Sequence, residues 1–441
     1  SVQAGPCAIL SDICPDDMGC SASATQIEEA LDAKKVVLII GGGYGGVKLA
    51  RALDAKVNTV LIDKKDHFFH CMASLRGACQ PDRAPDSVIP YNMLLKYGIV
   101  LQATVLEVQD KLVVLSNGRK LAFDACVCST GWAAGNAFWK PNTATAKETL
   151  VELRESTKQL AAASSVLLIG GGPISIELAG EILEASLNPS PPEITIISSS
   201  PKLMGATGVE DKLKDQLADQ LMKKGVKLVF GERVVSGVDM SKTGMHPGGT
   251  VVTYSSKSYS ADLIVVATGP RPVLPEKHPF KVSEQGRILV EKTLQCTGAS
   301  PHFFALGDCA ETGDAPTAYN SWQQAGVLAK NIVTFCEKGS SASLAQYKGQ
   351  GKAPAMLVPI GKQGAGQFPF MMVGPNLTYA IKGKGLFTDQ VLKDLNHAGK
   401  VKDLNSGLEA PRQEAIVRIQ RRMCAIMDMD GETLKKESII I

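Results

Sequence analysis

Two glycine-rich turns constrain what this chain can fold into more than any other feature. The first, at residues 41–46, follows a strand-like run at Val36–Ile40. The second, at residues 170–175, follows a similar run at residues 166–169, and a helix-like segment comes after each turn. In βαβ units of this kind the glycines let the backbone approach a pyrophosphate, and the helix N-terminus stabilises its charge. The chain is therefore predicted to bind two dinucleotides.

The first unit has every part of the dinucleotide-binding pattern. Residues 47–53 are predicted to form a helix and residues 59–62 a strand, and Asp63 follows about twenty residues after the turn. A carboxylate at this position can accept hydrogen bonds from both hydroxyls of a ribose. The alternative is a tight turn without a ligand, because glycine-rich turns are common. The complete context favours the dinucleotide.

The second unit departs from the pattern at two serines. Ser175 takes the third small position of the turn, and Ser198 stands where the ribose-binding acid is expected. Without a carboxylate there is no repulsion of a 2′-phosphate, and Ser198, Ser199 and Lys202 could donate hydrogen bonds to one. This favours tolerance of NADPH beside NADH. The alternative for Lys202 is a solvated surface lysine.

Composition limits the possible partners. A net charge of +3 over 441 residues gives no case for nucleic-acid binding, and the length suits two or three domains. No apolar run reaches about eighteen residues, so any membrane contact is predicted to be peripheral. The eleven cysteines lack the paired spacing of a zinc site or a redox disulfide. No metal site is predicted, and the thiols suggest a reducing compartment.

The fold class predicted is α/β, with two Rossmann-like dinucleotide-binding domains, one inserted in the other, and a C-terminal α+β region. Because the chain begins with Ser1, we expect a processed N-terminus, such as that left by removal of an organelle transit peptide. The predicted parts are an N-terminal arm (1–34), an FAD-binding domain (35–148 and 270–348), an NAD(P)H-binding domain (149–269), a C-terminal sheet region (349–400) and a helical extension (401–441).

The helical extension contains an amphipathic segment at residues 413–427. Basic residues lie mostly on one face, and apolar residues lie on another at helical spacing. One interpretation is a helix that binds a membrane surface or a partner complex. The alternative is a helix packed on the protein's own core. The apolar residues are Ile416, Ile419, Met423, Ile426 and Met427, and the basic ones are Arg418, Arg421 and Arg422.

Several further motifs join the first glycine turn in resembling one family. These are residues 63–70 with 73–76, the turns 129–131 and 267–269, the segment 307–310, and the segments 359–362 and 364–367. The chain resembles the two-dinucleotide flavoprotein oxidoreductases, and within them the branch of apoptosis-inducing factor 2 and ferroptosis suppressor protein, which is related to type II NADH dehydrogenases. The resemblance covers roughly residues 35–387.

The resemblance implies FAD as cofactor and NADH or NADPH as co-substrate. It implies that Glu177 lies near the nicotinamide, or alternatively serves as a dipole partner of its helix. Lys65 is the candidate cation that stabilises negative charge on the flavin, although Lys65 and His70 could instead pair with a carboxylate or cap a turn. Lys65 and Glu177 are thus the catalytic candidates. The cofactor-binding residues implied are Gly41, Gly43, Gly46, Asp63, Lys65, His70, Thr130, Gly131, Gly170, Gly172, Ser175, Gly269, Gly307 and Asp308.

The resemblance also implies a function. Electrons from NAD(P)H would pass through the flavin to a quinone or similar lipophilic acceptor at an organelle membrane, in a plastid or mitochondrion. Two alternatives stay open: an accessory FAD-binding subunit of a larger membrane complex, and a reductase of a small electron-transfer protein. The chain departs from the mammalian members because it lacks an N-terminal glycine acylation motif and carries the extra arm and tail.

Overall fold

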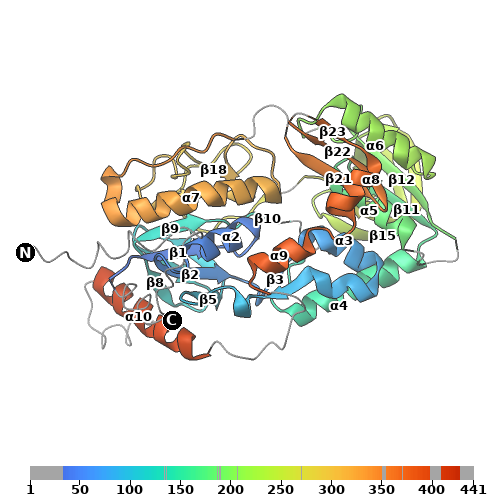
Figure 1. Ribbon diagram of the computed structural model, residues 1–441. Helices are drawn as coiled ribbons and strands as arrows, with labels where there is room; N and C mark the ends of the chain where they lie inside the picture. Colours follow the sequence, from blue (N-terminus) through green and yellow to red (C-terminus); the bar gives the residue numbers. More distant parts are fainter. Residues whose placement is uncertain are drawn as a thin grey trace, which may run out of the picture.

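The computed structural model contains two large β-sheets that lie side by side, with helices packed on them and between them (Figure 1). It describes residues 33–397 and the helix at 409–427, apart from positions 134, 136, 186, 188, 189, 206, 270, 350–353 and 370. Residues 1–32 of the predicted arm, with its processed N-terminus, and residues 398–408 and 428–441 lie outside the described residues.

The first sheet is entirely parallel and has the order β19-β9-β1-β2-β5. Its first strand, β1, pairs on one side with β2 and on the other with β9, so the strand order reverses at β1. In such sheets ligands bind beyond the carboxyl ends of the strands at this reversal. The strands are β1 (Val36–Ile40), β2 (Asn58–Asp63), β5 (Ile99–Gln102), β9 (Ala125–Cys128) and β19 (Phe303–Ala305).

Strand β1 divides the core of the first sheet into two layers because its side chains alternate between faces. Val37 and Ile39 pack with helices α2 (Tyr44–Leu53) and α7 (Ala318–Lys338). The other face, with Leu38, packs against a small antiparallel sheet of β6 (Val105–Val108), β7 (Leu112–Leu115) and β8 (Lys120–Ala122). Both faces of β1 are therefore buried, as its continuous apolar run requires.

The second sheet has the order β13-β12-β11-β16-β15-β14. Helix α4 (Ala146–Ala162) leads into it, and a capping box between Thr145 and Glu148 fixes the start of that helix. Helices α5 (Pro173–Glu184) and α6 (Asp211–Lys223) follow its strands. The strands are β11 (Ser165–Ile169), β12 (Glu193–Ser198), β13 (Lys227–Phe230), β14 (Val234–Ser236), β15 (Gly244–Thr253) and β16 (Ser258–Val266).

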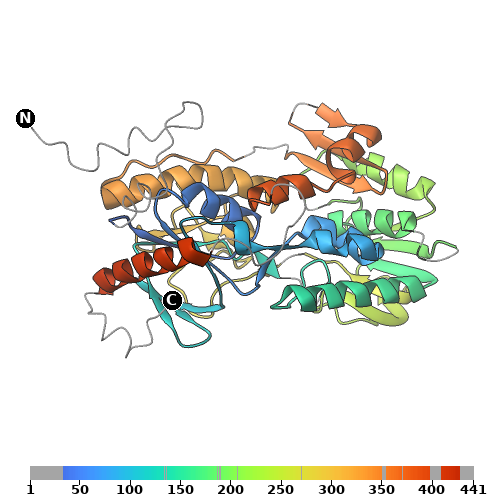
Figure 2. The same cartoon turned by 60° about the horizontal axis from the view of Figure 1, so that its bottom comes forward.

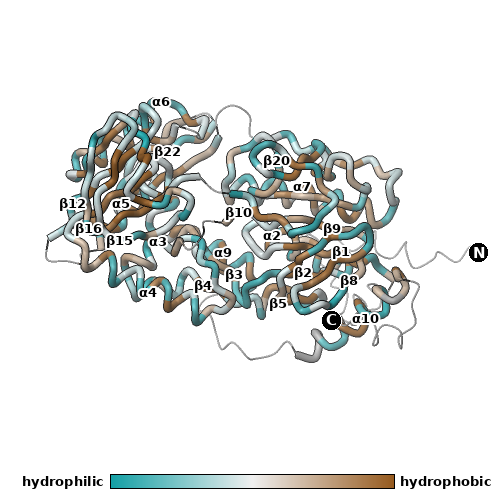
Figure 3. Tube along the Cα trace, turned by 180° about the vertical axis from the view of Figure 1, so that it is seen from behind, coloured by the Kyte–Doolittle hydropathy of each residue, from teal (hydrophilic) through white to brown (hydrophobic). Residues whose placement is uncertain are grey.

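The chain enters and leaves the second sheet at one place. Strand β10 (Trp132–Ala133) pairs antiparallel with β17 (Arg271–Pro272), so the two connections lie side by side. The predicted fold class, with one dinucleotide-binding domain inserted in another, is therefore confirmed, while the domain limits stay predictions. Figure 3 shows apolar residues concentrated in the strands of both sheets and in α5.

The C-terminal region forms an antiparallel sheet of β21 (Met356–Ile360), β22 (Gln363–Phe368) and β23 (Met371–Val373). It packs on α5, where a Cβ on Gly180 would lie 2.5 Å from the backbone nitrogen of Gly361. The sheet predicted within residues 349–400 is thus present, but the described part after β23 is helical. The helical elements are α8 (Pro375–Thr378), a π-helix η6 (Tyr379–Gly383) and α9 (Thr388–Asp394).

Helix α10 (Glu409–Met427) covers the first sheet on the side opposite α7 (Figures 1 and 2). All five apolar residues of its predicted face belong to the core beneath it, with Ile419 and Met423 fully buried. Arg418 donates from Nε to Asn58 Oδ1 at 2.8 Å and also bonds the Tyr97 carbonyl oxygen. The interpretation of this face as a membrane surface is wrong, because the protein's own core covers it.

Candidate functional site

The first glycine turn needs glycine at two positions for different reasons. Gly41 has φ +106°, and a Cβ there would lie 2.5 Å from the Ser129 carbonyl oxygen. A Cβ on Gly46 would lie 1.9 Å from the Gly41 carbonyl oxygen. Gly43, by contrast, would meet nothing within 4 Å. The turn is tight toward the protein and open at Gly43, which is the arrangement that lets a pyrophosphate approach the helix N-terminus.

Asp63 is fixed at this turn by two backbone hydrogen bonds. Its Oδ2 accepts from the Gly42 N–H at 2.6 Å, and its Oδ1 accepts from the Lys65 N–H at 2.8 Å. The buried Tyr91 hydroxyl donates to the Gly42 carbonyl oxygen at 2.7 Å. The carboxylate that the sequence predicts for the ribose therefore lies against the turn predicted for the pyrophosphate.

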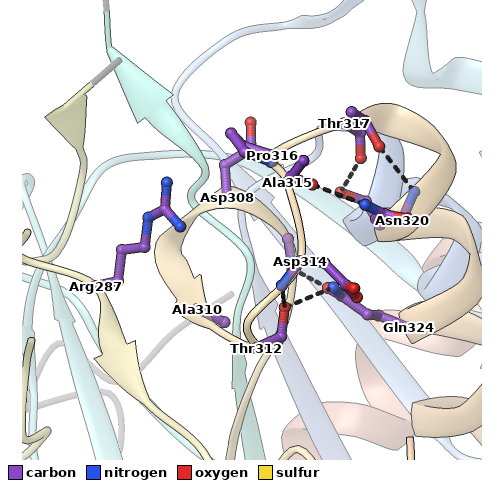
Figure 4. A pocket seen from close by; sticks show the side chains of 12 residues that line it. Arg287, Asp308, Ala310, Thr312, Asp314, Ala315, Pro316, Thr317, Asn320 and Gln324 are labelled. Carbon is purple, nitrogen blue, oxygen red and sulfur yellow. Dashed lines mark hydrogen bonds between the residues drawn. The ribbon is translucent and has the colours of Figure 1, made fainter. Parts of the chain in front are cut away.

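Asp308 lines a small pocket between the end of the first sheet and the start of α7 (Figure 4). It lies on the turn Gly307–Cys309, and Gly307 has φ +75°. The first turn of α7 points at the same pocket, with Thr317 accepting from the Asn320 N–H at 3.2 Å. Burial raises the pKa of Asp308, and the nearby Lys140 and Arg287 oppose that rise. The pocket combines an acceptor carboxyl with a positive helix terminus.

Lys140 was not predicted as part of the site. Its ammonium lies 5.5 Å from the centre of the Trp132 ring and exerts its charge on Asp308, Lys65 and Cys71. It is thus a cation near Asp308 and Lys65, two of the residues that the resemblance assigns to the cofactor. No local motif marks this lysine, because it lies in the loop between β10 and α4 and its surroundings depend on which side chains the fold brings near it.

The Lys65 ammonium is held by backbone carbonyl oxygens. Its Nζ donates to the carbonyl oxygens of Pro141 and Thr143, at 2.7 and 2.6 Å. Burial, with Lys64 adding to it, lowers the pKa of Lys65 to about 8. The alternative interpretation, a lysine that holds a turn, describes this geometry, and a role of Lys65 toward the flavin stays a prediction.

The His70 ring is hydrogen-bonded to a side chain of the first glycine turn. Its Nδ1 lies 2.7 Å from the hydroxyl oxygen of Tyr44, the first residue of α2. Burial lowers the pKa of His70 to about 3, so the ring is neutral. The neighbouring turn at Thr130 and Gly131 lies at the crossing between the two sheets, where the Thr130 hydroxyl donates to the Val273 carbonyl oxygen.

The second glycine turn repeats the geometry of the first. Gly170 has φ +122°, and a Cβ there would lie 2.5 Å from the Ala267 carbonyl oxygen, just before Gly269. Gly172 meets nothing within 4 Å. Among the described residues, Ser175 is fully buried and its Oγ has no hydrogen-bond partner. The turn is open to a ligand at Gly172, and the Ser175 hydroxyl keeps its hydrogen-bonding capacity.

Glu177 lies in α5 beyond its first turn, and its partner is a lysine that the sequence did not indicate. Lys382 Nζ, from the π-helix η6, lies 2.7 Å from Glu177 Oε1 and 3.0 Å from the Leu357 carbonyl oxygen. Both side chains are about nine-tenths buried. Burial raises the pKa of Glu177, and Lys382 limits the rise. Glu177 is therefore the partner of a buried cation rather than of the helix dipole.

The structure brings the predicted residues together in two groups. One group surrounds the end of the first sheet, and the other surrounds the start of α5, with Lys382 beside it. FAD fits the first group, because that turn is open only at Gly43, Asp63 is held against it, and Asp308 with the α7 terminus lies at the same end of the sheet. A nicotinamide dinucleotide fits the second, because its turn is open at Gly172. The individual residue roles stay predictions.

Known proteins share this arrangement. The family model of pyridine nucleotide-disulphide oxidoreductases matches residues 35–326. The chain is 32% identical over 384 residues to apoptosis-inducing factor homolog B of Dictyostelium discoideum, which covers 82% of this chain and 97% of that protein. It is 26% identical over 372 residues to ferroptosis suppressor protein 1 of Homo sapiens, and this match covers 82% of this chain and 96% of that protein. NDH2 of Plasmodium falciparum in complex with NADH shares the fold, with a TM-score of 0.62 at 14% identity, over 82% of this chain and 98% of that one.

These similarities confirm the resemblance found in the sequence. They support FAD and a nicotinamide dinucleotide as the cofactors, and the chain is a flavin-dependent NAD(P)H oxidoreductase by family. This chain belongs to the pyridine nucleotide-disulphide oxidoreductase family.

Proposed function

We propose that this chain passes electrons from NADH or NADPH to a quinone or similar lipophilic acceptor at an organelle membrane, in a plastid or a mitochondrion. When bound, FAD supplies the hydride acceptance and passes electrons on one or two at a time. The protein's residues orient the cofactors and exclude water. The observation that carries the proposal is the buried Lys382–Glu177 pair, which joins the predicted nicotinamide side to the C-terminal region.

A relay through a disulfide is not part of the proposal. Cys71 and Cys79 are the first and last residues of α3 and carry free thiols. Both lie on this helix, so their Cα atoms are about 12 Å apart at about 1.5 Å of rise per residue. Disulfide partners need Cα atoms within about 7 Å. These two cysteines therefore do not form a disulfide relay, and the proposal assigns the bound flavin an external acceptor.

Anaerobic mixing of the purified protein with NADH or NADPH tests the proposal. We expect the visible flavin absorbance to fall and a short-chain quinone to restore it. A flavin that stays oxidised with both nucleotides would contradict the proposal and favour an accessory subunit. A flavin that is reduced but reoxidised only by a small electron-transfer protein would favour that class of acceptor instead.

The C-terminal region offers the surface that a lipophilic acceptor would meet. Met371, Leu377 and Ile381 are 54%, 47% and 37% exposed, within one short segment. Residues 338–388 contain several lysines but no Asp or Glu, so this segment is positively charged. The element that places Lys382 beside Glu177 thus exposes Ile381 to solvent. Among the described residues no helix is long and apolar enough to cross a bilayer. We propose that this surface contacts anionic lipid.

Replacing Met371, Leu377 and Ile381 together with serine should abolish binding to vesicles that contain anionic phospholipid. The physical reason is the loss of exposed apolar area that would enter the lipid interface. Cosedimentation with vesicles measures binding. Val151→Ser with Met222→Ser is the matched control, because those side chains are 55% and 51% exposed on other helices. Equal binding to vesicles by the triple variant and the wild type would refute the proposed contact between this surface and anionic lipid.

The second nucleotide site favours use of NADPH as well as NADH. Ser198 ends β12, and its Oγ lies 3.2 Å from the Ser200 N–H, which donates to it. A Cβ on Gly171 would lie 2.6 Å from the same Oγ, so this hydroxyl is at the phosphate turn. Lys202, however, is paired with Asp211 and Asp215, at 3.3 and 2.9 Å. We therefore attribute the expected use of NADPH to the absence of an acidic residue at position 198 rather than to Lys202.

Ser198→Asp should lower kcat/KM for NADPH at least about tenfold, because the new carboxylate and the 2′-phosphate are like charges and placing them together costs several kcal/mol. The kcat/KM for NADH should stay within about twofold of the wild-type value. Steady-state kinetics with both nucleotides measures the ratio. Ser236→Asp, on the exposed edge strand β14, is the control. An unchanged NADPH to NADH ratio in Ser198→Asp would show that this position does not contact the ribose.

A further inference from the structure

One arginine in the motif 73–76 has no role in the function described so far. Arg76 lies near the end of α3 (Cys71–Cys79). Helix α3 itself lies between the first sheet and α5 (Figure 1). Its side chain is 11% exposed, and burial of a guanidinium requires several partners. The partners of Arg76 come from two other parts of the chain.

Arg76 binds the second dinucleotide-binding domain through a bidentate ion pair. Its Nε lies 3.0 Å from Glu181 Oε2, and its Nη2 lies 2.8 Å from Glu181 Oε1. The Glu181 side chain is 5% exposed. Two parallel hydrogen bonds between a planar fork and a carboxylate fix orientation as well as distance. Helix α5 is thereby held at one angle to α3.

Arg76 also binds the C-terminal region. Its Nη2 donates to the Gly383 carbonyl oxygen at 2.7 Å, and its Nη1 donates to the Lys384 carbonyl oxygen at 3.2 Å. These two carbonyls directly follow Lys382 in the chain. One guanidinium therefore joins the first domain, the inserted domain and the C-terminal region.

The contacts of Arg76 lie beside both halves of the Lys382–Glu177 pair. Glu181 is one helical turn beyond Glu177 on α5, and Gly383 follows Lys382. We propose that Arg76 is a positioning residue, which sets the place of the Lys382–Glu177 pair and of the nicotinamide site relative to the first domain. This inference rests on the proposed function, because it concerns the same hydride transfer.

Lysine cannot replace this arginine, although it keeps the charge. An ammonium is a point charge on a flexible stem, so it cannot bind both oxygens of Glu181 in one plane and two carbonyls at once. Hydride transfer demands close alignment, and a displacement of about 1 Å can cost about a hundredfold in rate. Arg76→Lys should therefore slow the transfer while the protein stays folded and keeps its flavin.

The test compares Arg76→Lys, Glu181→Gln and the double variant with the wild type, each loaded with FAD. We expect the limiting rate of flavin reduction at saturating NADH to fall about 10- to 100-fold in each single variant. The double variant should be no slower than the slower single one, since the two residues act as one unit. Arg83→Lys is the matched control, because Arg83 forms a more exposed ion pair with Asp86 nearby.

A second readout does not depend on turnover. Amide hydrogen exchange in η6 and α5 should become faster in Arg76→Lys and stay unchanged in Arg83→Lys, because the lost hydrogen bonds tie these elements to α3. Wild-type limiting rates and wild-type exchange in Arg76→Lys would overturn the inference. So would a lower melting temperature with an unchanged limiting rate, which marks a purely structural ion pair. A wild-type protein whose flavin NADH does not reduce would instead overturn the proposed function.

Discussion

Replacing Gly46 with alanine is expected to give a protein that no longer retains flavin and is less stable by about 2–3 kcal/mol. The new Cβ would lie 1.9 Å from the Gly41 carbonyl oxygen and 2.8 Å from Ser129 Oγ. The first of these is backbone, so the clash cannot be relieved by moving a side chain. Alanine gains about 1 kcal/mol of helix propensity over glycine, which is less than the cost of separating α2 from the turn. Flavin content after desalting and the denaturation midpoint measure the two effects.

Gly43→Ala is the matched control for this experiment. Gly43 has φ −76°, which alanine adopts without strain, and its Cβ would meet nothing within 4 Å. This variant should keep the stability of the wild type but bind FAD more weakly, because the methyl group enters the space left for the pyrophosphate. If Gly43→Ala binds FAD as tightly as the wild type, the dinucleotide does not lie where we place it. If Gly46→Ala is as stable as the wild type, the close approach at Gly41 is not needed.

The parts of the site that could be predicted from the sequence are those fixed by local conformation. The Gly41 and Gly170 turns need positive φ and close backbone approach, which only glycine allows, so a few adjacent residues carry the signal. Asp63 is found by its spacing from the first turn. The start of α4 is likewise local, because Thr145 and Glu148 cap it within one turn.

The parts that could not be predicted depend on contacts distant in sequence. Lys382 and Glu177 are 205 positions apart, and Arg76 and Glu181 are 105 apart. No spacing rule links such residues, so their pairing appears only when three regions of the chain meet. The surroundings of Lys65 also depend on residues distant in sequence. Its charge was evident from the sequence, but the carbonyls of Pro141 and Thr143 that bind it were not.

Helix α10 illustrates a different limit. Its periodicity correctly predicted a helix with one apolar face, yet a pattern of this kind does not say what covers that face. The structure covers it with the core of the first domain. Arg422 then pairs with Asp124 at 3.0 Å. Burial alone would raise the pKa of Asp124, but the hydrogen bonds that it accepts, first among them that from Arg422, hold this pKa below its usual value. Arg418 and Arg422 thus serve the fold.

Lys382→Met is expected to lower turnover about a hundredfold and to make stability depend on pH. The substitution removes the ammonium 2.7 Å from Glu177 and leaves that carboxylate buried without its cation. Removing one partner of a buried ion pair costs about 3–5 kcal/mol when the other stays charged. Glu177 can avoid that cost by binding a proton, because burial raises its pKa and Lys382 no longer opposes the rise.

The sign of the pH dependence follows from proton binding. In the variant, folded Glu177 holds a proton between its unfolded pKa of about 4.3 and its raised folded pKa, whereas the unfolded chain does not. The free energy of unfolding therefore falls as pH rises through this window. Urea denaturation should show Lys382→Met close to the wild type near about pH 5 and most destabilised near about pH 8.

Adding Glu177→Gln to Lys382→Met tests the cause of this effect. The double variant has no buried charge at the pair, so its stability should lose the pH dependence of the single variant, whereas its turnover should stay low. Lys362→Met, in the exposed turn between β21 and β22, is the control for removing a lysine from the same region. A single variant equally stable at both pH values, with turnover like that of Lys362→Met, would mean that the Lys382–Glu177 pair neither stabilises the junction nor takes part in electron transfer.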